Sequence, residues 1–192
     1  MKNSIFNITL SGMALFVLLA VAAGCGKKQA LPKGEELVSV YCSGDEYFSD
    51  KKHFRANAIG ESMDQMTAKK KATANAREEL AGSIQVTMKA VLDNYVNSRE
   101  ANNVEDIEER FEGLSRQVIN QVLSGTRTIC EKQTKTESNT YKTYMAIELR
   151  GDDLVQAINE RLTEDQKLRI DYDYEKFKKT FEDEMEKMEN RY

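Results

Sequence analysis

Three cysteines and one histidine are the residues of this 192-residue chain whose types best suit catalysis or metal binding. Cys42 and Cys130 are far apart, and neither belongs to a C-x-x-C pair, which is the usual pattern of a zinc ribbon or a thioredoxin-type redox centre. His53 has no second histidine with which to share a zinc ion. It lies in a charged stretch before a short strand pattern. We therefore interpret it as an exposed or strand-edge residue, and not as a ligand or general base.

The other polar clusters do not match a catalytic pattern. The sequence contains no G-x-S-x-G nucleophile elbow and no glycine-rich phosphate loop. The carboxylates of Glu105, Glu108 and Glu109 lie near the start of a predicted helix, where the helix dipole favours negative charge. The basic run Lys69–Lys71 is interpreted as an exposed helix face. We therefore predict no catalytic residue, no metal site and no cofactor.

Cys25 follows a segment with the composition of a secretory signal peptide. This segment has a positive charge at Lys2, an apolar run over 13–23 and small residues over 22–24. The apolar run is shorter than the ~20 residues of a membrane-spanning helix. That length disfavours the alternative, an uncleaved helix with an incidental cysteine. We therefore expect residues 1–24 to be a signal peptide that is removed on export.

The small residues before Cys25 resemble the bacterial lipobox, although Ala22 stands where that pattern usually has leucine. The resemblance implies that Cys25 becomes the first residue of the mature chain and carries acyl groups such as palmitate. Residues 25–36 are then the lipidated cysteine and a tether. Gly26 is not the aspartate that is associated with inner-membrane retention in some bacteria. This favours a lipid anchor in the outer membrane of the cell envelope, facing the periplasm.

Export would place Cys42 and Cys130 in an oxidising compartment, where disulfides persist. The two positions are 88 residues apart in the sequence. On the chain-entropy model, a bridge across such a loop would stabilise the fold by about 4 kcal/mol. The sequence leaves two possibilities open: a Cys42–Cys130 disulfide, or two small thiols that are buried separately.

Composition indicates one helix-rich globular domain after the signal peptide. The chain has no tryptophan and one proline, and its formal charge of -4 becomes about -5 when Lys2 is removed. This mild acidity is spread over segments of mixed sign, which argues against the basic surface of a nucleic-acid-binding protein. Beyond residue 24, no apolar run is long enough to span a bilayer.

Hydrophobic periodicity predicts seven elements in the order β, α, α, β, β, α, α. Their ranges are a strand over 54–60, a helix from 62 to about 98–103, a helix over 104–123, strands over 126–135 and 141–149, a helix over 151–162 and a final helix over 163–192. Capping boxes at Ser62–Gln65 and Thr163–Gln166 are predicted to open the long helix and the final helix. The order predicts an α+β fold in which long helices cover a small antiparallel sheet.

The final helix carries an apolar stripe that allows two interpretations. Its residues recur at steps of three and four, namely Ile170, Tyr174, Phe177, Phe181, Met185, Met188 and Tyr192. If the helix packs on its own domain, these side chains are core. If the helix projects, they form an exposed seam for a partner helix or for self-association. The residues of this possible seam are Phe177, Phe181, Met185 and Met188.

Two segments resemble the LPP-twenty family of bacterial lipoproteins. They are Arg55–Ser62, with the sequence RANAIGES, and an alanine-rich stretch that contains Ala68–Ala72 and Ala76–Ala81. The resemblance is clearest over 42–84 and extends by element order to Arg150. It implies a dodecin-like α+β fold, with helices packed on an antiparallel sheet. It also implies no enzymatic activity and no cofactor.

We expect one LPP-twenty-like domain over 37–162, followed by a C-terminal helical extension over 163–192. The expected function is that of a non-enzymatic envelope lipoprotein with a structural or protein-interaction role. Its expected partners are the membrane, through the N-terminal lipid, and an envelope protein or a second copy, but no nucleic acid. An alternative is a small apolar ligand in a groove between sheet and helices, lined by residues such as Tyr141 and Met145. A hydrolase that uses carboxylates alone is the third hypothesis.

Overall fold

The computed structural model describes residues 34–36, 38–97, 104–165 and 172–190. Contacts divide the chain into two units, Met1–Val38 and Ser39–Tyr192, and the architecture given below is that of the second unit. The expected signal peptide, Cys25 and most of the expected tether lie outside the described residues. Among the residues that are described, no helix has the length and apolar character needed to cross a membrane.

Three antiparallel strands form a sheet in the order β1-β3-β2. They are β1 (His53–Ser62), β2 (Arg127–Lys135) and β3 (Tyr141–Arg150). The hairpin of β2 and β3 provides the central strand, and β1 pairs with β3 along its whole length, from His53 opposite Arg150 to Ser62 opposite Tyr141. The outer side of β1 is therefore one edge of the sheet.

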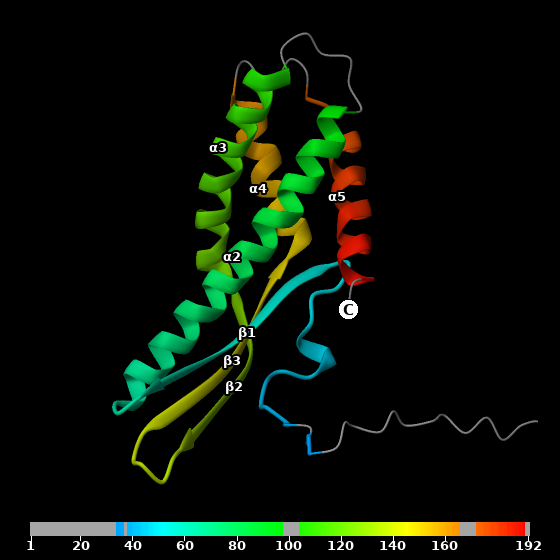
Figure 1. The fold of residues 1–192 in the computed structure, drawn as a ribbon. Helices are drawn as coiled ribbons and strands as arrows, with labels where there is room; N and C mark the ends of the chain where they lie inside the picture. The colour runs from blue at the N-terminus through cyan, green and yellow to red at the C-terminus, as the bar shows by residue number, and fades with distance from the viewer. Residues whose placement is uncertain (1–33, 37, 98–103, 166–171, 191–192) are drawn as a thin grey trace, which may run out of the picture. The chain divides into compact units, whose positions relative to one another are not determined.

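The described helices are α2 (Gln65–Asn97), α3 (Val104–Val122), α4 (Gly151–Glu164) and α5 (Tyr174–Glu189). Two short 3-10 turns accompany them, η1 (Asp45–Tyr47) and η2 (Leu123–Gly125). The predicted α+β fold, a small antiparallel sheet covered by long helices, is confirmed. Figure 1 shows the N-terminal half of α2 crossing the sheet, with the other helices gathered around its C-terminal half.

Side chains alternate between the two faces of the sheet, as the period of a strand requires. The face toward α2 is apolar and carries Phe54, Ala56 and Ala58 opposite Leu149, Ile147 and Met145. One side of α2 is buried against it and beyond it, from Ala68 through Ala72, Ala76, Leu80, Ile84, Met88 and Val91 to Tyr95. This face forms the part of the core that lies between the sheet and α2.

Small residues bring α2 close to β1. A Cβ atom on Gly60 would overlap the backbone oxygen of Ala68 and the backbone nitrogen of Ala72. The alanines on the facing side of the helix are fully buried. The strand and the helix backbones therefore meet at a distance that only glycine permits at position 60.

Helix α5 completes the core of the same unit. Phe177 packs against the rings of Tyr95, Phe111 and Tyr172, and Phe181 packs against Phe54 of β1. All four residues of the possible seam are buried, with 0 to 5% of their surface exposed: Phe177, Phe181, Met185 and Met188. The hypothesis of an exposed seam is therefore wrong for these side chains, because they pack on the chain's own sheet and helices. Ile170 and Tyr192 lie outside the described residues.

Both predicted capping boxes are wrong. Ser62 is still paired with Tyr141 in the sheet, so the cap of α2 falls on Asp64, whose carboxylate accepts from the Thr67 amide at 2.7 Å. The side chain of Gln65 instead reaches Gln133 of β2.

At the other predicted box, Thr163 lies inside α4 and donates to the Asn159 carbonyl at 2.9 Å. Helix α5 is capped by Asp173, which accepts from the Lys176 amide at 3.1 Å. Gln166 lies outside the described residues.

Candidate functional site

The face of the sheet opposite α2, called the open face below, is lined mainly by polar side chains. It carries His53, Arg55, Asn57, Ile59 and Glu61 of β1, and Lys142, Tyr144, Ala146, Glu148 and Arg150 of β3. The N-terminal segment 39–50 lies against this face and along the β1 edge. The segment is attached to the sheet at two places.

The first attachment is a disulfide. Cys42 and Cys130 are bonded, with their Cα atoms 5.6 Å apart. A register shift between Thr128 and Cys130 places Cys130 opposite Ala146, whose side chain is on the open face. Beside the bond, the Tyr41 ring packs edge-on against Tyr144 at 5.4 Å. Of the two possibilities that the sequence left open, the structure contains the disulfide.

The second attachment uses the edge of β1. The Arg55 amide donates to the Ser49 hydroxyl at 2.8 Å, and this hydroxyl donates to the Arg55 carbonyl at 3.1 Å. The Asp50 amide donates to the His53 carbonyl at 3.0 Å. Ser49 and Asp50 thus satisfy the outward backbone groups of His53 and Arg55, as a short neighbouring strand would do.

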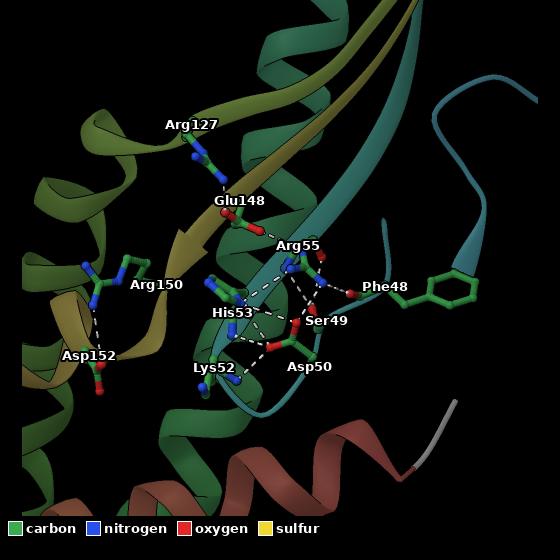
Figure 2. A network of polar contacts seen from close by, with 10 residues as sticks. All are labelled: Phe48, Ser49, Asp50, Lys52, His53, Arg55, Arg127, Glu148, Arg150 and Asp152. Atoms are coloured by element: carbon green, nitrogen blue, oxygen red, sulfur yellow. Dashed lines mark hydrogen bonds and ion pairs between the residues drawn. The ribbon is translucent and has the colours of Figure 1, made fainter. Parts of the chain in front are cut away.

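Charged side chains extend from the second attachment across the sheet to β2 in an open-face network, defined as Asp50, His53, Arg55, Arg127 and Glu148 (Figure 2). The Glu148 carboxylate is 8% exposed and accepts from Arg55 Nε at 2.7 Å and from Arg127 Nη2 at 2.8 Å. Arg55 also contacts the Asp50 carboxylate at 2.8 Å. His53 Nδ1 lies 3.1 Å from the same carboxylate. Arg55 is the centre of this network.

The two carboxyl groups of the network favour the ionised form. Burial alone would raise the pKa of Glu148, but the hydrogen bond from Arg55, the nearby His53 and the bond from Arg127 outweigh it, and the pKa is lowered. Burial likewise opposes ionisation of Asp50. The hydrogen bonds from Lys52 and His53 and the charge of Arg55 lower the pKa of Asp50 overall. Both groups therefore serve as fixed negative charges at neutral pH.

This arrangement holds the segment 39–50 in place, and its carboxylates are paired with arginines. The nearest hydroxyl, that of Ser49, is occupied by the Arg55 backbone. Arg55 Nη1 donates to the Phe48 carbonyl at 3.0 Å, and Arg55 Nη2 lies 3.4 Å from His53 Nδ1. Within the described part of the chain, no group of three or more His, Cys, Asp or Glu residues could hold a metal ion. The prediction that His53 is a strand-edge residue is confirmed, since it is the first residue of β1.

Next to the network is a cleft of about 580 Å³ between the start of β1, α4 and α5. Its lining carries both signs of charge, and two of its pairs are in contact: Arg150 with Asp152 at 3.5 Å, and Lys178 with Glu182 at 3.8 Å. Figure 2 shows Arg150 and Asp152 apart from the other charges. This balance of charges does not define a ligand class.

A groove of about 790 Å³ follows the free edge of β1 and is called the β1-edge groove. Its walls come from the β1 edge, the outer side of α2 and the segment at η1. They include Tyr47, Phe48, Arg55, Asn57, Asn75, Glu78, Glu79, Gly82 and Val86. Phe48 and Val86 are exposed by 38% and 63%. This groove combines apolar side chains, carboxylates and strand backbone in one place.

A smaller cleft of about 260 Å³, the α2–α3 cleft, lies between those two helices. Its walls include Met88, Leu92, Phe111 and Ile119, which are 1 to 3% exposed. Ser115 also lines it, and its buried hydroxyl has no hydrogen-bond partner in the described structure. By contrast, Met145, predicted to line a groove against the sheet, is a core residue that is 1% exposed.

Comparison of this chain with protein-family models, curated proteins and solved structures gives no match. The resemblance to the LPP-twenty family therefore stays a prediction. The open-face network is not visible in the sequence, because Arg55 and Glu148 are 93 residues apart. The alternation of polar residues in β1 and β3 was the available signal for it, since both strands have a polar face.

Proposed function

We propose that this protein is a lipid-anchored, non-enzymatic lipoprotein of the bacterial cell envelope, related to the LPP-twenty family, with a protein-interaction role. The observation that carries the proposal is the pattern before Cys25: a positive charge, an apolar run and small residues ahead of a cysteine. The lipid at Cys25 holds the domain at the outer membrane, facing the periplasm.

The Cys42–Cys130 disulfide supports export, because such bonds persist in oxidising compartments. It also fits a tethered protein. The bond attaches the chain to the sheet 17 residues after Cys25. A force on the tether is therefore transmitted to the loop that the disulfide closes.

The non-enzymatic role is supported by how the candidate catalytic groups are used. Asp50 and Glu148 are paired with the arginines of the open-face network, and the Ser49 hydroxyl is bonded to backbone. A general base or nucleophile has to face the substrate. Instead, the grooves described above provide apolar and charged walls that suit a bound partner.

The anchor can be tested by metabolic labelling with an alkyne-tagged palmitate in the native bacterium. The full-length protein should carry the label and sediment with membranes. Cys25→Ser should lose the label and the membrane association, whereas the matched control Gly26→Ala should keep both. A Cys25→Ser protein that is still labelled, or that still sediments with membranes, would contradict the proposal.

The interaction role can be tested by crosslinking the anchored protein in its own membrane. A defined crosslinked complex, either with an envelope protein or with a second copy, is expected from the full-length protein and not from Cys25→Ser. Recovery of the uncrosslinked monomer alone, at crosslinker levels that capture a known envelope complex, would contradict the role.

A second candidate function is the binding of a small amphipathic ligand in the α2–α3 cleft. The unpartnered Ser115 hydroxyl favours it, because a buried hydroxyl without a partner is costly and a ligand could satisfy it. Lys89 stands at the rim of the apolar walls and suits a carboxylate head group. Native mass spectrometry after incubation with lauric acid tests this function. Binding should be lost in Ser115→Val and kept in Asn120→Ala, a control on the exposed side of α3.

A further inference from the structure

The outward backbone groups of β1 are satisfied at the N-terminal end of the strand and only in part farther along it. In an antiparallel strand, alternate residues direct both their N–H and C=O groups to the same side. The contacts of Ser49 and Asp50 show that this side is the edge for His53 and Arg55. The same alternation directs the groups of Asn57, Ile59 and Glu61 to the edge.

Helix α2 covers part of the remaining edge. The Asn75 amide donates to the Ile59 carbonyl at 3.1 Å, and the Lys71 ammonium donates to the Glu61 carbonyl at 3.1 Å. Among the described residues, nothing bonds to the outward N–H or C=O of Asn57, or to the N–H of Ile59. Asn57 is therefore the point at which β1 offers both a donor and an acceptor.

These free groups open into the β1-edge groove, which Asn57 itself lines. Val86 supplies an apolar wall on the α2 side, and Phe48 supplies one on the η1 side. Figure 2 shows the Phe48 ring directed away from the polar network. An extended segment that pairs with the edge would place alternate side chains against these two walls.

The charge of the groove is negative. Glu78 and Glu79 are exposed on α2, and neither carboxylate takes part in an ion pair within the described structure. Arg55 is the cation of the lining, and its charge is balanced by Asp50 and Glu148. The groove thus complements a ligand that carries positive charge.

We infer that the β1-edge groove binds an extended, lysine- or arginine-rich segment of a partner protein by adding it as a strand next to Asn57. This inference rests on the proposed interaction role and names its site and the chemistry of the partner. The bound segment pairs with the part of the edge that Ser49 and Asp50 do not cover, and it forms backbone hydrogen bonds with Asn57 and Ile59. Its basic side chains reach Glu78 and Glu79.

The test uses the mature lipidated protein in detergent and two peptides. In the basic peptide lysine alternates with valine, and in its acidic twin glutamate replaces lysine. Fluorescence anisotropy should show that the basic peptide binds at least about tenfold more tightly than the acidic twin at low salt, with the difference shrinking as salt is added. Hydrogen exchange of the Asn57 and Ile59 amides should slow when the basic peptide is bound.

Two matched pairs of variants locate the binding. Asn57→Pro removes the outward donor without removing a bond to β3, and proline is tolerated at such an edge position. It should weaken binding about tenfold, whereas Asn57→Ala, which keeps the backbone groups, should bind like the original protein. The double change Glu78→Gln and Glu79→Gln should weaken binding and remove its salt dependence, whereas Asp93→Asn, at an exposed carboxylate of α2 outside the groove lining, should not.

The inference is overturned if the two peptides bind equally, if neither binds, or if exchange slows elsewhere than at the edge of β1. Equal effects of Asn57→Pro and Asn57→Ala would also overturn strand addition. Should Asn57→Pro unfold the domain, the glutamate variants and the exchange measurement still decide the question. A membrane crosslink that survives all groove variants would overturn this site and leave the interaction role in place.

Discussion

Glu148 is the residue on which the charges of the open face depend. Its buried carboxylate neutralises Arg55, which in turn holds Asp50 and the Phe48 carbonyl. Removing one member of a buried ion pair leaves the other charge uncompensated, which costs more than the pair itself contributes. The network therefore predicts that replacing Glu148 destabilises the fold much more than replacing its more exposed partner, Arg127.

We expect Glu148→Gln to lower the free energy of unfolding by about 2 kcal/mol at neutral pH. Arg127→Gln should cost less than about 1 kcal/mol, because the Arg127 side chain is 75% exposed and its ion pair is screened by water. Urea denaturation followed by circular dichroism measures both values. Equal losses in the two variants would contradict the dependence of the network on Glu148.

The stabilisation from Glu148 should also depend on pH. Because its pKa is lower in the folded protein than the ordinary value of 4.5, the ionised form stabilises the fold above about that pH. As the pH falls through the lowered pKa, this contribution is lost. The difference in stability between the original protein and Glu148→Gln should therefore shrink when urea denaturation is repeated below pH 4.5. A difference that grows on acidification would mean that the pKa is raised.

At the scale of elements, the contact between β1 and α2 allows a sharp comparison of two glycines. Gly60→Ala places a Cβ against the backbone of Ala68 and Ala72, so α2 has to shift, at a cost of about 3 kcal/mol. Gly82→Ala lies on an exposed part of α2 with nothing within 4 Å of the new atom. It should stabilise the fold by about 0.5–1 kcal/mol, since alanine is the better helix former. Thermal unfolding should show a lower melting temperature for Gly60→Ala and a higher one for Gly82→Ala than for the original protein.

Helix α5 allows a second comparison, between a buried and an exposed ring. Phe177 is fully buried between α2, α3 and the residues before α5, whereas Tyr174 is 36% exposed. Phe177→Ala should lower the free energy of unfolding by about 3–5 kcal/mol, and Tyr174→Ala by less than about 1 kcal/mol. Urea denaturation of the monomer measures both. A Phe177→Ala protein that keeps its stability but changes its oligomeric state would restore the seam hypothesis.

The order of the elements was predictable because periodicity is a local property of the sequence. The stripes of α2 and β3 are visible in the spacing of residues such as Ile84 and Ile147, and both are core in the structure. Helix starts were less predictable. Ser62 had the right neighbours for a cap, but its pairing with Tyr141 keeps it in the sheet. Such competition between strand and cap is settled by a contact 79 residues away.

The candidate site was less predictable than the fold for the same reason. The edge position of β1 follows from the strand order β1-β3-β2, which depends on pairing between distant segments. Burial of Phe177 and its neighbours depends on where α5 packs, and an amphipathic stripe is the same for a core helix and a projecting one. The two cysteines could be named as a possible pair, but their approach is a property of the folded sheet.

At the scale of the whole molecule, the disulfide joins the N-terminal segment to the most distant strand of the sheet. The bond closes a loop of 88 residues that contains β1, α2 and α3. The unfolded chain loses much of its freedom when such a loop is closed, so the folded state is favoured. Along the chain, Cys42 comes after the expected lipid at Cys25 and before the strands of the sheet. The disulfide therefore joins the chain that leads from the anchor directly to the sheet.

This position leads to the last prediction, which concerns the double variant Cys42→Ser and Cys130→Ser. Its free energy of unfolding should be about 4 kcal/mol lower than that of the original protein under oxidising conditions. The original protein should fall to nearly the same value when it is reduced. The matched control is Cys25→Ser, which removes the third cysteine but keeps the bridge, and its stability should not change. Urea denaturation with and without dithiothreitol distinguishes these outcomes. If reduction leaves the original protein unchanged while the double variant is destabilised, the loss comes from packing around Cys42, which is 6% exposed, and not from closure of the loop.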